Sequence, residues 1–306
     1  DQTIRWIHTQ KAAAPNKPFF VYQALGTAHA PHQAPEEWIA KFRGKFDHGW
    51  DEERKRTLQR QKDMGLVPQD TQLAPRPNQI PAWNTLTGSE QKVYARFMEV
   101  YAAMLAHQDY QMGRLLAELE RMGLAENTLI IYIEGDNGAA AETGLHGSIN
   151  ELPDTTSSAM KLNYDMEWLA NNLNVIGGPE SYAAIPAGWS VAMNTPLPWT
   201  KQMASHLGGV RNGMVISWPK YVQDTNSIRT QFHHVIDVVP TILEATGIQA
   251  PSTVDGIVQQ PIEGTSMLYA FNDATSPGQK STQYFELFAN RAIYHEGWWA
   301  NTTPRD

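Results

Sequence analysis

The sequence contains no cysteine in its 306 residues. This absence excludes disulfide bonds, thiolate zinc sites and a cysteine nucleophile within the chain. It leaves the cellular compartment open, and a periplasmic or secreted location remains compatible with the sequence.

The sequence is also poor in positive charge and in long apolar runs. It carries 24 Lys and Arg against 32 Asp and Glu, which gives a formal net charge of −8. Binding to a nucleic acid regardless of its sequence depends on neutralising phosphates, so we expect no nucleic-acid partner. No apolar stretch approaches the roughly 18 residues of a membrane span. The 42% hydrophobic content, with 10 Trp, 11 Tyr and 9 Phe, is typical of a globular chain of one large or two modest domains.

The order of the expected elements predicts an α/β fold. The capping-box spacing of Thr87 and Glu90, followed by apolar residues at helical period, predicts one long helix over about 89–122. A β-rich run follows directly, as a βαβ unit requires. The further expected elements are strands at 18–25, 128–134 and 214–218, helices within 36–62 and at 231–245, and hairpin strands at 284–288 and 291–294.

Two regions lie outside this regular pattern. Residues 139–200 are rich in Gly, Ser, Asn and Pro, and a loop of that length inside a compact domain usually serves a function. From about residue 275 the hairpin strands predict a small C-terminal antiparallel sheet. The expected domains are therefore a catalytic α/β domain over 1–274 and the start of a subdomain over 275–306.

Asp136 and Asn137 follow the strand at 128–134, where ligands bind in open α/β sheets. The flanking glycines allow both side chains to reach one site. Their oxygens are hard donors, which suit Ca²⁺ or Mg²⁺ better than zinc. The alternative is an ordinary turn, because Asp, Asn and Gly are common turn residues.

Histidines and a lysine occupy other loops next to expected strands. His29 and His32 follow the strand at 18–25, and Lys201 and His206 precede the strand at 214–218. One or both imidazoles could lie at the same sheet edge, and Lys201 beside the glycine pair at 208–209 could bind an anion. Taken singly, they could equally be loop histidines and a surface lysine.

In combination, these pieces resemble the sulfatase family of the alkaline-phosphatase superfamily, and its arylsulfatases in particular. The matching segments are Pro18-Phe-Phe-Val-Tyr, Thr27-Ala-His29-Ala-Pro31, Tyr101-Ala-Ala-Met, Asp109-Tyr-Gln-Met-Gly-Arg114, Asp136-Asn137-Gly138, Lys201, His206-Leu-Gly-Gly-Val-Arg211, His234-Val-Ile-Asp-Val-Val-Pro-Thr, Asp255-Gly256 and Glu263-Gly-Thr-Ser266. The resemblance covers nearly the whole chain and is weakest over 40–85 and 150–195.

The resemblance implies a mostly parallel sheet between helices and a sulfuric ester hydrolase. Asp136 and Asn137 would supply part of a metal site, usually for Ca²⁺ and less often for Mg²⁺. His29, Lys201 and His206 would bind the substrate, with His29 and Lys201 as catalytic residues and His29 as the acid for the leaving oxygen. In the family chemistry a formylglycine attacks sulfur, and the substrate is a small-molecule or carbohydrate sulfate ester.

The sequence departs from this family at the nucleophile. Formylglycine arises from a Cys/Ser-x-Pro-x-Arg motif, and the nearest match, Ser217-Trp-Pro219-Lys-Tyr221, has Tyr in place of Arg. We therefore expect the chain to be the C-terminal part of a sulfatase whose nucleophile and paired Asp ligands lie upstream. On its own, such a fragment should be inactive and bind metal weakly.

Three alternatives remain at this point. A phosphonate or phosphate ester hydrolase of the same superfamily would use a similar site. A sulfatase-like binding protein would hold sulfated ligands without hydrolysis. A structural α/β domain without a site would require several motifs to match by chance. The particular sulfate ester and the oligomeric state cannot be read from the residues.

Overall fold

The computed structural model describes residues 1–152 and 165–302. The chain divides into two compact units. Unit 1 consists of Asp1–Glu126 and Ile133–Met214, and unit 2 consists of Asn127–Tyr132 and Val215–Asp306. Unit 1 is built mainly from helices, and unit 2 contains most strand residues together with further helices. The chain as a whole therefore combines helices and strands, as expected of an α/β chain. The expected domain boundary between residues 274 and 275 stays a prediction.

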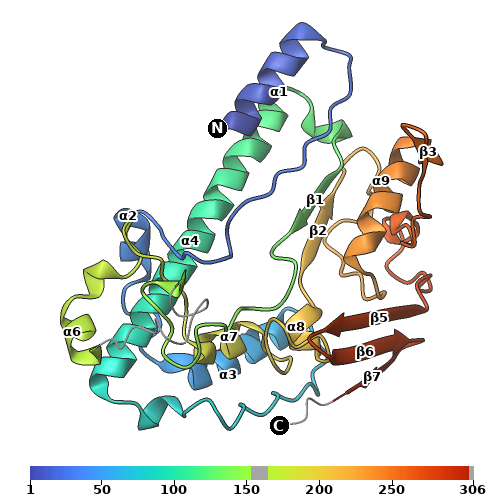
Figure 1. The fold of residues 1–306 in the computed structure, drawn as a ribbon. Coiled ribbons are helices and arrows are strands. Elements are labelled where there is room, and N and C mark those ends of the chain that lie inside the picture. The colour runs from blue at the N-terminus through green and yellow to red at the C-terminus, as the bar shows by residue number, and fades with distance from the viewer. Residues whose placement is uncertain (153–164, 303–306) are drawn as a thin grey trace. The chain divides into compact units, whose positions relative to one another are not determined.

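Unit 1 is organised around the 34-residue helix α4 (Gly88–Arg121) (Figure 1). It begins at the predicted capping box, in which the Glu90 amide donates to Thr87 Oγ1 at 3.2 Å and the Thr87 amide donates to Glu90 Oε2 at 2.8 Å. All residues from Val93 to Tyr101 are buried, whereas only Gln108 and Leu119 are buried after Met104. The first half of the helix therefore lies in the core, and the second half is largely open to solvent.

Helix α1 (Gln2–Ala13) lies beside the C-terminal part of α4 (Figure 1). His8 Nε2 contacts Glu118 Oε1, and Arg114 Nη2 donates to Asp1 Oδ1 at 2.8 Å. These polar contacts attach α1 to the exposed half of α4.

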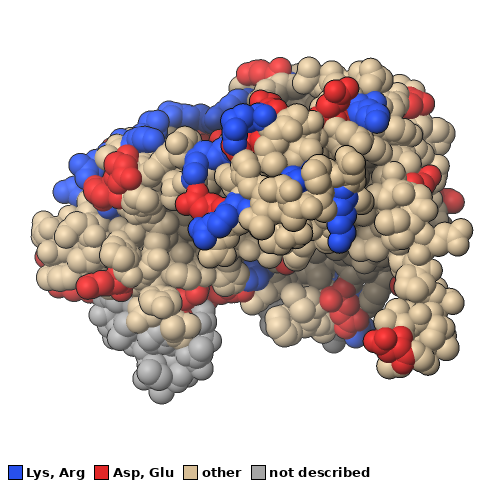
Figure 2. All heavy atoms as spheres, turned by 90° about the horizontal axis from the view of Figure 1, so that it is seen from above, with Lys and Arg blue, Asp and Glu red and all other residues tan. Residues whose placement is uncertain are grey.

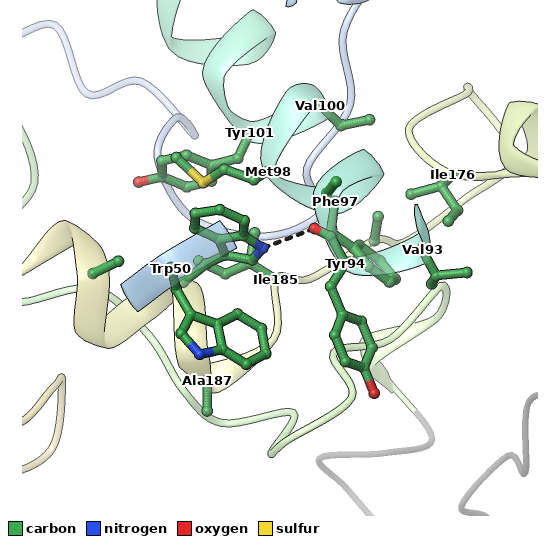
Figure 3. Close-up of a cluster of buried hydrophobic side chains, with 14 of the residues drawn as sticks. Trp50, Val93, Tyr94, Phe97, Met98, Val100, Tyr101, Ile176, Ile185 and Ala187 are labelled. Carbon is green, nitrogen blue, oxygen red and sulfur yellow. Dashed lines mark hydrogen bonds between the residues drawn. The ribbon is translucent and has the colours of Figure 1, made fainter. Parts of the chain in front are cut away.

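The core of unit 1 gathers aromatic side chains from segments far apart in the sequence. Trp50 and Trp189 are 1% and 0% exposed, and Trp50 meets Trp83 edge to face at 4.8 Å between ring centroids. The buried indole Nε1–H of Trp189 donates to the Tyr94 carbonyl at 2.8 Å (Figure 3). This cluster joins the first half of α4 to α2 (Glu36–Ile39), η1 (Ala40–Phe42), α3 (Gly49–Asp63), η2 (Trp83–Thr85), α6 (Met166–Asn171), η5 (Leu173–Val175) and α7 (Ala187–Met193). Two further short helices of the chain are η3 (Ala125–Asn127) and α8 (Leu207–Val210).

The prediction of a buried strand over 18–25 is wrong. The segment is extended but belongs to no strand, and Phe20 and Tyr22 are 69% and 85% exposed. An apolar run forms a buried strand only beside a partner strand, and this run pairs with none among the described residues.

The predicted loop over 139–200 contains more structure than expected. It holds α6, η5 and α7, and Ser148 forms an antiparallel bridge with Ala184. Residues 153–164 of this loop lie outside the described residues.

Strands β1 (Ile130–Ile133) and β2 (Met214–Ser217) pair in a two-stranded sheet, which confirms two of the predicted strands. The predicted helix over 231–245 begins later than expected, with η6 (Val235–Asp237) followed by α9 (Val238–Thr246). The start moves because the Asp237 carboxylate caps the His234 amide at 2.8 Å. The helix ends at Gly247, which takes the left-handed conformation with a φ of 67°.

The remainder of unit 2 is antiparallel. Strands β3 (Thr253–Val254) and β4 (Ile257–Val258) form a short pair. Strands β5 (Thr282–Leu287), β6 (Asn290–His295) and β7 (Trp298–Asn301) form a three-stranded sheet in which Thr282 opposes His295. The short helix η7 (Leu268–Ala270) precedes them. The predicted C-terminal hairpin is thus confirmed.

The buried carboxylate of Asp237 connects the parts of unit 2. Its Oδ1 accepts from Lys280 Nζ at 2.9 Å and from the Thr265 amide at 2.8 Å. Both Asp237 and Lys280 are buried, so this is a buried ion pair with additional hydrogen bonds.

The surface carries both signs of charge, and Figure 2 shows Lys and Arg intermingled with Asp and Glu on the face that it presents. Among the described residues, no helix has the length and apolarity needed to cross a bilayer.

Candidate active site

The turn after β1 carries Asp136 and Asn137. Gly135 has a φ of 76°, and this left-handed conformation turns the chain away from the direction of β1. Asn137 Nδ2 donates to Asp136 Oδ1 at 2.6 Å, and Asn212 Nδ2 donates to the Asn137 carbonyl at 2.7 Å. The side chains of the two predicted metal ligands are therefore adjacent, and the loop before β2 is hydrogen-bonded to the backbone of Asn137.

Lys201 is attached to the segment that follows this turn. Its amide donates to the Ala139 carbonyl at 3.0 Å. The Asn194 side chain bridges the same two loops, because Oδ1 accepts from the Ala139 amide at 3.0 Å and Nδ2 donates to the Trp199 carbonyl at 2.9 Å. Trp199 itself has a φ of 68°, a costly conformation that these hydrogen bonds help to maintain.

The structure brings Lys201 and His29 together, although 172 positions separate them. Lys201 Nζ lies 3.3 Å from His29 Nε2, and His29 Nδ1 lies 2.7 Å from the Ala30 carbonyl. An ammonium group can only donate, so Nε2 is the acceptor and Nδ1 carries the proton that reaches Ala30. His29 is thus held in one tautomer with Nε2 beside the ammonium group.

Glu142 completes this cluster, and the sequence reasoning missed it. Its Oε1 lies 3.0 Å from Lys201 Nζ and accepts from Gln202 Nε2 at 3.1 Å. The side chains of Lys201 and Glu142 are 20% and 24% exposed, so this ion pair is partly shielded from water. Nothing in the spacing of Glu142 and Lys201 indicates the contact, because both belong to irregular loops.

A small cavity of about 20 Å³ adjoins His29. It is lined by His29, Ala30, His32, Ala140, Glu142, Thr143, Glu151, Ala184 and Ile185. Burial raises the pKa of Glu151, an effect that His29 and Lys201 oppose and Glu142 reinforces. Burial also lowers the pKa of His32 to about 4, so this imidazole is neutral at pH 7.

His206 makes its contacts elsewhere. Its Nδ1 lies 2.9 Å from Ser205 Oγ, and its ring lies 5.8 Å from that of Trp199. Burial lowers its pKa, which favours the neutral ring. His206 does not line the cavity, and the contacts above join it to Ser205 and Trp199 rather than to His29.

Asp136 and Asn137 match the donor chemistry of a Ca²⁺ site but not its number of ligands. Calcium takes six to eight oxygens, whereas these side chains offer two neighbouring groups, one of them already engaged with the other. Among residues 1–152 and 165–302, no three His, Asp or Glu side chains are grouped to hold a metal ion. The described residues therefore form at most part of a metal site.

Comparisons with known proteins identify the family of the chain. The sulfatase family model matches residues 1–248. A sulfatase of Schizosaccharomyces pombe is 32% identical over 94% of the chain and 50% of its own length. An arylsulfatase of Klebsiella aerogenes is 30% identical over 94% of the chain and 57% of its own length. The chain thus spans about half the length of these curated relatives.

Solved structures show the same fold at lower sequence identity. Ps i-CgsB, solved in complex with k-i-k-neocarrahexaose, has a TM-score of 0.52 at 17% identity. The matched region covers 99% of this chain and 44% of Ps i-CgsB. The Bacteroides fragilis protein yidJ has a TM-score of 0.50 at 14% identity, and the matched region covers 96% of this chain and 46% of yidJ. These similarities confirm the predicted alkaline-phosphatase-like α/β class. Since the family model matches most of its length, the chain belongs to the sulfatase family, whose members hydrolyse sulfate esters.

Proposed function

We propose that this chain supplies the sulfate-binding and acid groups of a sulfuric ester hydrolase of the arylsulfatase type. The observation that carries the proposal is the 3.3 Å approach of Lys201 Nζ to His29 Nε2. A fixed ammonium group beside an imidazole nitrogen suits an anionic ester that must lose an alcohol.

The two side chains have separate roles in this proposal. The Lys201 ammonium group binds the sulfate oxygens and offsets the charge that develops on the transferred group. His29 already donates its Nδ1–H to Ala30, so a second proton would reside on Nε2, next to the bound ester. From Nε2 the imidazolium donates that proton to the leaving oxygen, and the alcohol departs neutral.

The sulfatase family generally uses a metal and a formylglycine. The sequence contains no Cys/Ser-x-Pro-x-Arg motif, and the residues that the structure describes contain no full set of metal ligands. We therefore propose that the chain alone does not hydrolyse sulfate esters. Asp136 and Asn137 would contribute part of the metal site, with Ca²⁺ preferred by their hard oxygens. The proposed substrate is a small-molecule or carbohydrate sulfate ester.

The test uses a complete sulfatase in which these residues accompany the nucleophile motif. We expect His29→Ala to lower kcat/KM by at least about 100-fold for alkyl sulfates. The loss should be smaller for 4-nitrophenyl sulfate, because nitrophenolate leaves without a proton. Lys201→Met should impair both substrates equally. His295→Ala, at an exposed histidine of unit 2, is the control.

Near-normal turnover of alkyl sulfates by His29→Ala would contradict the acid role. Faster hydrolysis of 4-nitrophenyl phosphate than of the sulfate would favour a phosphoesterase of the same superfamily. Sulfate binding without any turnover by the complete protein would favour a non-catalytic binding protein.

A further inference from the structure

The ammonium group of Lys201 has two polar neighbours in the described part of the chain. Glu142 Oε1 lies 3.0 Å from Nζ, and His29 Nε2 lies 3.3 Å from it. An ammonium group carries three N–H donors, so a third N–H remains for a bound ester. Two acceptors that share one ammonium group lie within roughly 5 Å of each other. An anion bound to Lys201 therefore lies close to the carboxylate of Glu142.

The contacts of Glu142 require an oxygen atom but not a negative charge. Its Oε1 accepts from Gln202 Nε2 at 3.1 Å as well as from Lys201 Nζ. An amide oxygen accepts hydrogen bonds in the same way, so a glutamine at this position would hold both donors. What the carboxylate adds is a negative charge next to the proposed anion site.

This charge cancels that of Lys201 over the pair as a whole. A first negative charge on a ligand gains the directed N–H of the ammonium group. A second negative charge is attracted by Lys201 and repelled by Glu142, so it adds little affinity. The two side chains are 20% and 24% exposed, and charges that are partly shielded from water interact more strongly than charges in open solvent.

Glu151 shows the same repulsion on a negative group that lines the cavity beside His29. Burial raises the pKa of Glu151, His29 and Lys201 oppose this change, and the charge of Glu142 reinforces it. The field of Glu142 thus reaches the space next to His29, where the ester would lie.

We propose that Glu142 is a specificity-determining residue that favours monoanionic esters over dianions at Lys201. Sulfate monoesters carry one negative charge, whereas phosphate monoesters and free inorganic sulfate carry two at neutral to basic pH. The proposal rests on the proposed function, because the ester must bind at Lys201 and His29. Glu142 acts through the charge that it places beside Lys201 and has no contact with the reacting atoms. The same charge would favour release of the sulfate ion after hydrolysis.

The test compares phenyl sulfate with phenyl phosphate at pH 8. The two esters share one alcohol and a similar shape, but the phosphate carries a second charge because its second pKa is about 6. Affinities come from NMR titration of the chain labelled with ¹⁵N-histidine. In Glu142→Gln, we expect both affinities to rise and the ratio of phosphate to sulfate affinity to increase at least about fivefold. A residue that only anchors Lys201 would leave this ratio unchanged.

Three further variants separate charge from position. Glu142→Asp keeps the charge and should keep a ratio close to that of the unchanged chain. Glu142→Ala should raise the ratio while lowering both affinities, because Lys201 loses its anchor, and it provides the answer if Glu142→Gln does not fold. Glu180→Gln removes a charge from an exposed position of the same unit and should leave the ratio unchanged.

The outcomes distinguish this proposal from the proposed function. An unchanged ratio in both Glu142→Gln and Glu142→Ala would overturn the role of Glu142 while ester binding stands. Failure of the unchanged chain to bind either ester at millimolar concentration would contradict the proposed function. In that case, binding of phenyl phosphate that appears in Glu142→Gln would still support the role of Glu142, and no binding in that variant would overturn it.

Discussion

Gly138 lies directly against the backbone of Gly208. A Cβ atom on Gly138 would fall 1.7 Å from the Gly208 carbonyl oxygen, and the Gly138 amide donates to the Gly209 carbonyl at 2.9 Å. This contact holds the turn of Asp136 and Asn137 against the loop that follows Lys201. The relative positions of the proposed site residues therefore depend on a glycine without chemistry of its own.

We expect Gly138→Ala to destabilise unit 1 by about 1–3 kcal/mol or more, because backbone must move to admit the methyl group. Sulfate affinity should fall at the same time, since the Lys201 loop shifts. Urea unfolding and NMR titration with sulfate measure the two effects. Gly113→Ala is the control, because its Cβ would meet nothing within 4 Å in the helix interior. That variant should be more stable by roughly 0.5–1 kcal/mol. Unchanged sulfate affinity in Gly138→Ala would show that the contact does not position the site.

His32 should make unit 1 less stable in mild acid. Burial lowers its folded pKa from 6.5 to about 4, so its neutral form favours folding. That stability is fully present above pH 6.5 and is lost as the pH falls toward 4, to a total of about 3 kcal/mol. Urea unfolding at several pH values between 7.5 and 4 should show this slope, and His32→Gln should flatten it. An equal slope in the variant would assign the pH dependence to another group.

Removing the buried carboxylate of Asp237 should destabilise unit 2. Burial alone would raise the pKa of Asp237, but interactions with His233, Lys280 and two backbone amides outweigh it and hold that pKa far below its usual range. The ionised form therefore stabilises the fold above about pH 4, and that stability is lost as the pH falls toward the folded pKa. We expect Asp237→Asn to cost about 3–5 kcal/mol at pH 7, because Lys280 is left buried without its anion.

Asp255→Asn is the matched control for Asp237→Asn. Asp255 is exposed and has a φ of 48°, which asparagine also tolerates, so its effect should stay within about 0.5 kcal/mol. Thermal unfolding followed by circular dichroism compares the two variants. A similar stability for both would argue that the ion pair with Lys280 contributes little.

The chain by itself should bind Ca²⁺ weakly or not at all. Asp136 and Asn137 provide too few oxygens, and the described residues contain no group of three acidic or imidazole side chains that could hold a metal ion. Calorimetry with CaCl₂ should detect no binding in the micromolar range. Micromolar binding that disappears in Asp136→Ala would show that further ligands complete the site.

Local signals predicted the elements that local interactions determine. Thr87 and Glu90 specify where α4 begins, and Gly247 specifies where α9 ends, because each acts on its own backbone neighbourhood. The segment 18–25 has the composition of a buried strand, but its state depends on a neighbouring strand that composition cannot supply.

The candidate site was predictable in part for the same reason. His29 and Lys201 were expected near one another from their places after and before strands and from the family resemblance, and the structure brings them within 3.3 Å. Glu142 and Glu151 join them from an irregular loop without periodicity. His206 matched the motif, but its side chain packs on Ser205 and Trp199. Which side of a loop a residue presents depends on tertiary contacts.

The uneven burial of α4 has a consequence for its dynamics. The residues from Val93 to Tyr101 are all buried, whereas those after Met104 are exposed or half-buried apart from Gln108 and Leu119. Opening of the second half exposes little apolar surface, so it should occur at low free energy and independently of the core. Amide protons within this one continuous helix should therefore exchange with deuterium at very different rates, slowest near Phe97 and fastest toward Arg121.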